Sequence, residues 1–263
     1  MRIIGRAGGF TLIELVVVIT VMGILSVGAV KFITDASDGY ASTVRRTELG
    51  STMRLAAERM TRELRSALPN SVRVSGSCLE FIPVEAGASY LNLPVSITAS
   101  AFDAIEPIDV ALAGARIAVF PDSTNAVYSL GSPAVISPPS TIAPPDASHV
   151  VRVSLAVPHR FPVESPQRRL YLVREPVSYC VDQNRLWRYQ GYGFRAVQPT
   201  GAGLPTSMPG RSLIGEDLVA SSPPFTFATA TLTRNAEVGI DLEFRDTPDS
   251  IRVHHLVQLR NVP

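Results

Sequence analysis

Glu14 has the chemically most unusual surroundings in the sequence. It is the only ionisable residue between Phe10 and Val30, in a run of about 21 residues that reads FTLIELVVVITVMGILSVGAV. A helix of this length spans roughly 30 Å of hydrocarbon, and a carboxylate at the centre of a bilayer costs roughly 2.5–3.5 kcal/mol. A carboxylate kept in such a segment is suited to pairing with a positive charge.

Patterns typical of catalysis or metal binding do not occur elsewhere in the sequence. It has no nucleophile elbow, zinc-protease motif or phosphate-binding loop. The adjacent His254 and His255 would point to opposite faces of a strand, so they would share one metal ion poorly. Residues 122–125 and 246–249 carry oxygens that suit calcium, but these residue types favour turns, which we expect there. We expect no enzyme, no catalytic residue, no cofactor and no bound metal.

The apolar run has two ordinary explanations. A secretory signal has an apolar core of about 7–15 residues before a small-residue cleavage site, whereas this run is longer and contains a carboxylate. A plain membrane anchor fits the length but gives no reason for Glu14. Arg2 and Arg6 precede the run, so the positive-inside rule keeps the N-terminus cytoplasmic and places the chain after Lys31 on the opposite side.

Gly9, Phe10 and Glu14, within the stretch GFTLIE, resemble the processing signal of type IV pilins and type II secretion pseudopilins. The resemblance implies that prepilin peptidase removes residues 1–9 as a basic leader, cuts between Gly9 and Phe10, and methylates the new amine of Phe10. It also implies that Glu14 docks the subunit by pairing with the Phe10 amine of a neighbour. Many type IV pilins have a proline where this chain has Lys31, so helix loosening by proline is not expected.

An amphipathic pattern continues beyond the apolar run. Apolar residues recur at three- and four-residue intervals with Arg and Glu between them, and Pro69 predicts the end of the helix. We expect residues 10–30 to form the transmembrane and filament-core part of one helix, and residues 31–68 to form its amphipathic continuation. The apolar positions are Leu49, Met53, Ala56, Met60, Leu64 and Ala67.

Residues 72–263 read as β structure, so the predicted fold class is α+β, a long N-terminal helix packed on a β-rich, pilin-like periplasmic head. The clearest strand alternates, with Val238, Ile240, Leu242 and Phe244 on one face. The predicted strands are Cys78–Val84, Ala115–Phe120, Val150–Val157, Arg169–Arg174, Val177–Val181, Arg185–Tyr189, Thr226–Leu232, Glu237–Phe244 and Ile251–Leu259. The predicted surface loops, which hold many of the 21 prolines, are Ser132–Ser148 and Gln198–Pro209.

The chain has two cysteines, Cys78 and Cys180, and both lie in strand-like contexts beyond the apolar run. An oxidising compartment and an even count favour a disulfide between them, with two buried free thiols as the alternative. A closed loop of about 100 residues would stabilise the fold by up to about 4.7 kcal/mol through chain entropy. Major pilins typically clamp a C-terminal loop with their disulfide, and Cys180 is far from Pro263, which argues against a major pilin.

The head resembles minor pilins with large β-rich heads. The likeness rests on CLEFIP from Cys78, on VSYCV from Val177 with RLWRY from Arg185, and on HHLVQLRNVP from His254. These stretches are similar to the MshO-like subunit of mannose-sensitive haemagglutinin pili and, more distantly, to J-type pseudopilins and PilW-like subunits. The resemblance implies a minor pilin that primes the tip of a type IV pilus. A minor pseudopilin of a type II secretion system and a tip adhesin remain open.

Removal of the leader leaves 22 of the 24 Lys and Arg against 23 Asp and Glu. The mature chain therefore has no overall bias toward nucleic acid, although Arg168, Arg169, Arg185, Arg188 and Arg195 could form a local basic patch. The resemblance implies other partners, namely prepilin peptidase, other major and minor pilins, the inner-membrane assembly platform, and lipid before assembly. It implies a single pass through the inner membrane with a periplasmic head, and afterwards a place in the pilus, at its tip.

Overall fold

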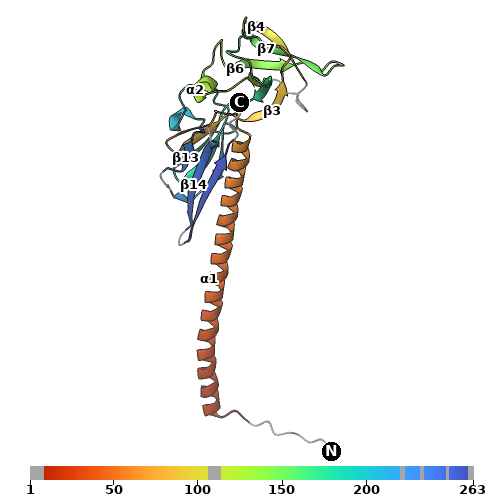
Figure 1. The fold of residues 1–263 in the computed structure, drawn as a ribbon. Coiled ribbons are helices and arrows are strands. Elements are labelled where there is room, and N and C mark those ends of the chain that lie inside the picture. Colours follow the sequence, from red (N-terminus) through yellow and green to blue (C-terminus); the bar gives the residue numbers. More distant parts are fainter. Residues whose placement is uncertain (1–8, 106–113, 220–222, 232–233, 247–248, 260–263) are drawn as a thin grey trace, which may run out of the picture. The chain divides into compact units, whose positions relative to one another are not determined.

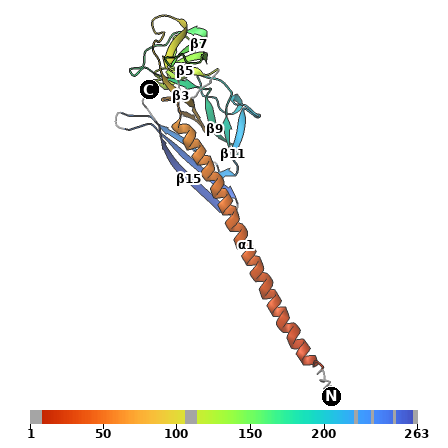
Figure 2. The ribbon, with the colours of Figure 1, turned by 90° about the vertical axis from the view of Figure 1, so that its right-hand side faces the viewer.

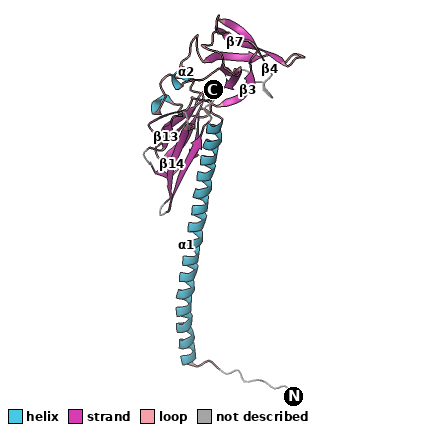
Figure 3. Ribbon diagram, viewed as in Figure 1, coloured by secondary structure: helices cyan, strands magenta, loops and turns pink. Residues whose placement is uncertain are grey.

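The computed structural model describes residues 9–105, 114–219, 223–231, 234–246 and 249–259 (Figure 1). The chain divides into two compact units, residues 1–50 and 51–263. The boundary lies within the long helix α1 (Leu12–Arg65), so the last turns of this helix belong to the second unit. The leader, residues 1–9, lies outside the described residues except for Gly9. The second unit consists mainly of antiparallel strands (Figure 3), and the predicted α+β class is confirmed.

Helix α1 begins after Thr11 and ends three residues before the predicted Leu68. It ends there because the following residues pair with a β segment: the Leu68 amide donates to the Ile82 carbonyl oxygen at 2.8 Å, and the Val84 amide donates to that of Ser66 at 2.9 Å. Within the second unit, the predicted apolar positions Met53, Ala56, Met60 and Leu64 are buried, as are Ala57 and Thr61. Through this stripe, the last four turns of the helix pack against the core of the second unit.

Within the described ranges, the strands form three sheets. The first sheet has the order β1-β2-β9-β10-β11, and Figure 2 labels β9 and β11. Strands β9 and β10 form a hairpin whose two-residue turn, Gln183 and Asn184, has positive φ at both positions, as a type I′ turn requires. The strands are β1 (Arg73–Ser75), β2 (Cys78–Phe81), β9 (Val177–Asp182), β10 (Arg185–Tyr189) and β11 (Arg211–Gly215).

The second sheet is built around β14 (Glu237–Asp246), which pairs with β12 (Leu218–Val219), β13 (Phe225–Ala228) and β15 (Asp249–Gln258). The predicted face of β14 is confirmed, because Val238, Ile240, Leu242 and Phe244 are all buried.

The third sheet is inserted between two neighbouring strands of the first sheet. All six of its strands lie in the stretch of chain that leaves β2 and returns to β9. Their order is β3-β8-β5-β6-β7-β4, and Phe102, Ile117, Val153 and Leu172 are in the core that they enclose. The strands are β3 (Val84–Ser89), β4 (Ala99–Ile105), β5 (Arg116–Ala118), β6 (Ile136–Ile142), β7 (Val150–His159) and β8 (Arg169–Val173).

Several strand predictions need correction. The predicted loop Ser132–Ser148 contains β6, which lies inside the third sheet. The predicted strand Cys78–Val84 divides at Pro83 into β2 and β3, which belong to different sheets. The predicted Thr226–Leu232 ends at Ala228, with Leu232 outside the described residues. Strands β1, β4, β11 and β12 were not predicted.

The two predicted turns also have different outcomes. The turn at 122–125 is the start of a short helix, α2 (Thr124–Tyr128), in which the Ser123 hydroxyl accepts a hydrogen bond from the Ala126 amide. In the turn at 246–249, residues 247–248 lie outside the described residues. The flanking residues Asp246 and Asp249 are register partners at the end of the β14–β15 hairpin.

Candidate processing and assembly site

Thr11 and Glu14 are brought together at the start of α1. The Glu14 amide donates to the Thr11 hydroxyl oxygen at 3.3 Å, and the Leu15 amide donates to the Thr11 carbonyl oxygen at 3.2 Å. Thr11 therefore caps the helix, and the spacing Thr-x-x-Glu is that of a capping box. The carboxylate of Glu14 also lies in the first turn, where the helix dipole favours negative charge. The cap therefore uses the backbone amide of Glu14, and the carboxylate itself lies exposed in the first turn.

Gly9 and Phe10 precede the helix and are exposed, and the side chain of Phe10 is 75% exposed. A Cβ atom added to Gly9 would meet no described atom within 4 Å. The fold beyond this point therefore does not itself require glycine at position 9. If only glycine is accepted there, the requirement comes from an enzyme that handles the bond between Gly9 and Phe10.

The first part of α1 presents a long, largely apolar surface. Among the described residues, α1 is the one helix long and apolar enough to cross a membrane, a test that also admits signal sequences near an N-terminus. Its hydroxyl side chains bond to backbone carbonyl oxygens one turn earlier: Thr20 donates to Val17 at 2.8 Å, and Ser26 donates to Met22 at 2.7 Å. This segment can therefore enter hydrocarbon without exposing an unsatisfied hydroxyl group.

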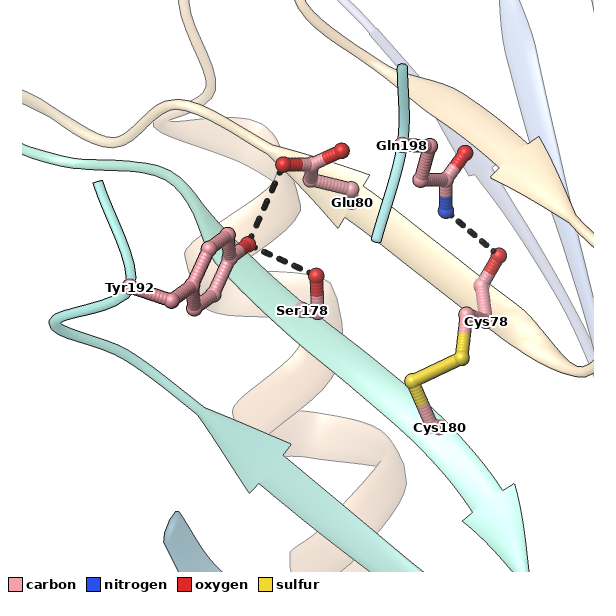
Figure 4. Close-up of a disulfide and its surroundings, with 6 residues drawn as sticks. All are labelled: Cys78, Glu80, Ser178, Cys180, Tyr192 and Gln198. Carbon is pink, nitrogen blue, oxygen red and sulfur yellow. Dashed lines mark hydrogen bonds between the residues drawn. A yellow bond between two sulfur atoms is a disulfide. The ribbon is translucent and has the colours of Figure 1, made fainter. Parts of the chain in front are cut away.

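The predicted disulfide between Cys78 and Cys180 is present in the second unit, with an S–S distance of 2.06 Å (Figure 4). The two cysteines are register partners on the adjacent strands β2 and β9, and both are buried. The side-chain amide of Gln198 donates to the Cys78 carbonyl oxygen at 3.0 Å, which holds the segment after β10 against the start of β2. The bond closes the stretch of chain that forms the third sheet.

A buried charged cluster lies beside the disulfide. Glu80, two residues after Cys78, is completely buried, and the Arg73 Nε donates to its carboxylate at 2.6 Å. Arg73 also donates to the carbonyl oxygens of Arg195 and Ala196, and its guanidinium lies 3.5 Å from the centre of the Tyr128 ring. One arginine therefore joins the first sheet to the segment that follows β10.

Tyr192 completes this cluster (Figure 4). Its hydroxyl donates to Glu80 at 3.2 Å, and it accepts from the Ser178 hydroxyl at 2.7 Å. Burial raises the pKa of Tyr192 well above its ordinary value, so the phenol keeps the proton that it donates. Burial also raises the pKa of Glu80, and the hydrogen bond and charge of Arg73 oppose part of that rise.

Sequence reasoning missed the cluster around Glu80. The signal was a glutamate within the apolar stretch CLEF, where all four residues are buried, so that no face of β2 is left for water. A buried carboxylate needs a buried cation or several donors, and the nearby Arg73 was available to provide one.

The other polar groups bear on metal-binding and basic sites. Within the ranges described, no group of three or more His, Cys, Asp or Glu side chains is placed to hold a metal ion. Two of the arginines considered as a basic patch are engaged separately, since Arg188 pairs with Glu63 at 3.0 Å and Arg185 pairs with Glu216 at 3.8 Å.

Comparisons with known proteins agree with the N-terminal geometry. Residues 4–30 match the prokaryotic N-terminal methylation motif, a type IV pilin-like prepilin signal that includes Gly9, Phe10, Glu14 and the apolar start of α1. No curated protein and no solved structure matches the chain.

Proposed function

We propose that this protein is a minor pilin that takes part in assembly of a type IV pilus of the mannose-sensitive haemagglutinin type, where it primes the tip. The observation that carries the proposal is the methylation motif at residues 4–30, which ends within a helix whose apolar N-terminal part is exposed. The motif implies processing by prepilin peptidase and handling by the pilin assembly machinery. The apolar helix is consistent with a membrane-anchored subunit.

In this proposal, cleavage after Gly9 creates a positive amine on Phe10, about one helical turn from Glu14. In a filament, the Phe10 amine of one subunit pairs with Glu14 of a neighbour, where low polarity strengthens the attraction. The apolar side chains from Leu12 to Ile33 then exchange lipid for the helices of other subunits. This burial supplies the main driving force, and the charge pair sets the register between subunits.

The head supports a minor rather than a major subunit. The disulfide joins β2 to the central strand β9 instead of clamping a loop near the C-terminus. A head of about 190 residues is also large for a repeated shaft subunit, because adjacent narrow helices leave little space between heads. At the tip of a filament, the head has no subunit above it.

Intact-mass analysis of protein extracted from the membrane fraction tests the central step. We expect a chain that begins at a methylated Phe10, and we expect Gly9→Val to retain the leader. The matched control is Gly8→Val, which leaves the cleavage glycine in place. Because the described fold has open space at Gly9, a block in Gly9→Val reports on the peptidase and not on misfolding. A mature chain that begins at Lys31 or later would contradict the proposal.

A further inference from the structure

An open groove lies where the end of α1 meets the third sheet and the second sheet. Its volume is about 960 Å³, within the range of small-ligand sites. Strand β3 lies beside the C-terminal end of the helix in both ribbon views (Figures 1 and 2). The lining residues are Arg62, Arg65, Ser66, Ala67, Pro69, Val84, Gln167, Arg169, Tyr171, Asn235, Gln258 and Leu259, all within the second unit.

The charge of this groove has a single sign. Three arginines line it, Arg62 and Arg65 from α1 and Arg169 from β8, and none of its lining residues is acidic. In the part of the chain that the structure describes, none of the three forms an ion pair. The helix dipole accounts for cations in the last turn of α1, but it does not account for Arg169 on a strand.

A second groove nearby provides an internal comparison. It has a volume of about 650 Å³ and also contains arginines, but their charges are neutralised within the chain. Arg174 pairs with Glu85 at 3.1 Å, and Arg188 pairs with Glu63 at 3.0 Å. Among the described residues, the arginines of the larger groove have no such carboxylates, so its positive potential is available to a ligand.

The uncharged polar residues of the larger groove indicate the kind of anion that fits. Gln167 and Gln258 are exposed, and each side-chain amide can donate and accept hydrogen bonds at once. Sugar hydroxyl groups have the same double capacity, whereas a phosphodiester backbone offers acceptors only. The ring of Tyr171 is half-buried in the lining and offers an apolar surface beside these groups.

We propose that this groove binds an acidic oligosaccharide, a sugar chain that carries carboxylate or sulfate groups. Arg62, Arg65 and Arg169 bind the anionic groups, and Gln167 and Gln258 bind hydroxyl groups. Nucleic acid fits less well, since Tyr171 is the one aromatic residue lining the groove and binding to single strands relies on successive stacked bases. The proposal concerns the head alone and can be tested without filament assembly.

The test measures binding by the mature full-length protein in nanodiscs of uncharged phosphatidylcholine, by calorimetry at low salt. The first probe is an oligogalacturonate, and its control is the same oligosaccharide with the carboxyl groups reduced to alcohols. A sulfated oligosaccharide of similar length distinguishes carboxylate from sulfate recognition. We expect the oligogalacturonate or its sulfated counterpart to bind, the reduced form to bind at least tenfold more weakly, and the affinity to fall as salt is raised.

Arg169→Gln should weaken binding about tenfold, because each charged hydrogen bond lost costs roughly that factor. The matched control is Arg54→Gln, an exposed arginine on the same helix outside the groove, which should bind like wild type. Thermal unfolding of both variants verifies that the head is intact. Equal binding of the reduced sugar, an unchanged affinity in Arg169→Gln, or tighter binding of single-stranded DNA or a polyglutamate peptide would each overturn the proposal.

Discussion

The cap of α1 and the charge of Glu14 are two features that mutation can separate. The Thr11 hydroxyl caps the helix by accepting from the Glu14 amide, and in the proposed filament the Glu14 carboxylate pairs with the amine of a neighbouring subunit. The first contact is confined to one chain, and the second exists only between chains. A loss of the cap therefore affects the end of a helix, whereas a loss of the charge affects the assembly step.

We expect Glu14→Ala to leave processing intact and to reduce incorporation of the subunit into filaments, because in the proposed filament the carboxylate contacts a neighbour and not the scissile bond. Immunoblotting of sheared pili against whole cells measures this. The control is Thr11→Ala, which removes the cap at a cost of about 1 kcal/mol but keeps the charge. Equal loss of incorporation in both variants would contradict a specific role for the Glu14 charge.

The pair between Arg73 and Glu80 predicts a large loss of stability. Arg73→Gln leaves the carboxylate of Glu80 buried without its cation, and breaking a buried pair in this way costs about 3–5 kcal/mol. The control is Arg152→Gln, which breaks a pair with Asp103 whose arginine is 55% exposed, and it should cost less than about 1 kcal/mol. Urea unfolding of the two variants compares them. Similar losses of unfolding free energy in the two variants would show that the head tolerates a buried Glu80 without the charge of Arg73.

At the scale of elements, His159 connects the end of β7 to the segment before β6. It is fully buried, and its Nε2 donates to the Ala134 carbonyl oxygen at 2.9 Å. Burial lowers the pKa of His159, and the bond to Ala134 opposes part of that effect. The folded protein therefore keeps this ring neutral at a pH where the unfolded chain already binds a proton.

The stability of the head should consequently fall as the pH drops below about 6.5, the ordinary pKa of histidine. Above that pH both states are neutral at this residue, and His159 contributes no pH dependence. His159→Gln keeps a donor for Ala134 and should flatten the decline between about pH 7 and pH 5. The exposed His255→Gln serves as the control in the same unfolding measurements. An unchanged pH profile in His159→Gln would contradict this assignment.

The sequence predicted helices and strands well where one face is buried and the other is exposed to solvent. The apolar stripe of α1 from Met53 to Leu64 and the alternating face of β14 follow simple periods, and both are buried as expected. The cysteine pairing followed from their number and compartment. The motif at Gly9, Phe10 and Glu14 could also be identified from the sequence, because such a motif is defined by residue type and spacing more than by the fold.

Strand β6 shows why some strands could not be predicted from the sequence. Pro138 and Pro139 argue against an inner strand, since proline cannot donate to a ladder. The sheet avoids this conflict: β6 pairs with β5 around residues 136–139 and with β7 from Ser140 onward, with a register irregularity on the β5 side. The Ser137 hydroxyl also accepts from the Ile117 amide at 2.9 Å, in place of a backbone carbonyl. Hydrogen bonds of this kind, which replace those of a regular strand, involve residues distant in sequence and therefore cannot be predicted from the local pattern.

At the scale of the whole molecule, the proposed tip position predicts a specific deletion phenotype. The first subunits of an open helical filament form before any neighbour supports them, so loss of a priming subunit reduces initiation. We expect deletion of the gene to lower the number of surface pili far more than the adhesion of each remaining pilus. Electron microscopy and adhesion measurements on the same cells separate the two. Normal pilus numbers with lost adhesion would favour a tip adhesin.

The same measurements address the secretion alternative. A minor pseudopilin would leave pili unchanged and impair the release of secreted proteins. Assaying the culture medium of the deletion strain for its major secreted enzymes therefore distinguishes a secretion component from a pilus component.

The disulfide has a mechanical consequence. In the proposed filament, a pulling force that enters the head through α1 and leaves the chain beyond Cys180 reaches Cys78 soon after the helix ends. The covalent bond passes that load directly to Cys180, so the stretch of chain between the two cysteines, with all six strands of the third sheet, stays outside the path of tension. At about 3.4 Å per extended residue, some 350 Å of chain cannot be drawn out. An oxidised head can therefore bear traction while its inserted sheet remains folded.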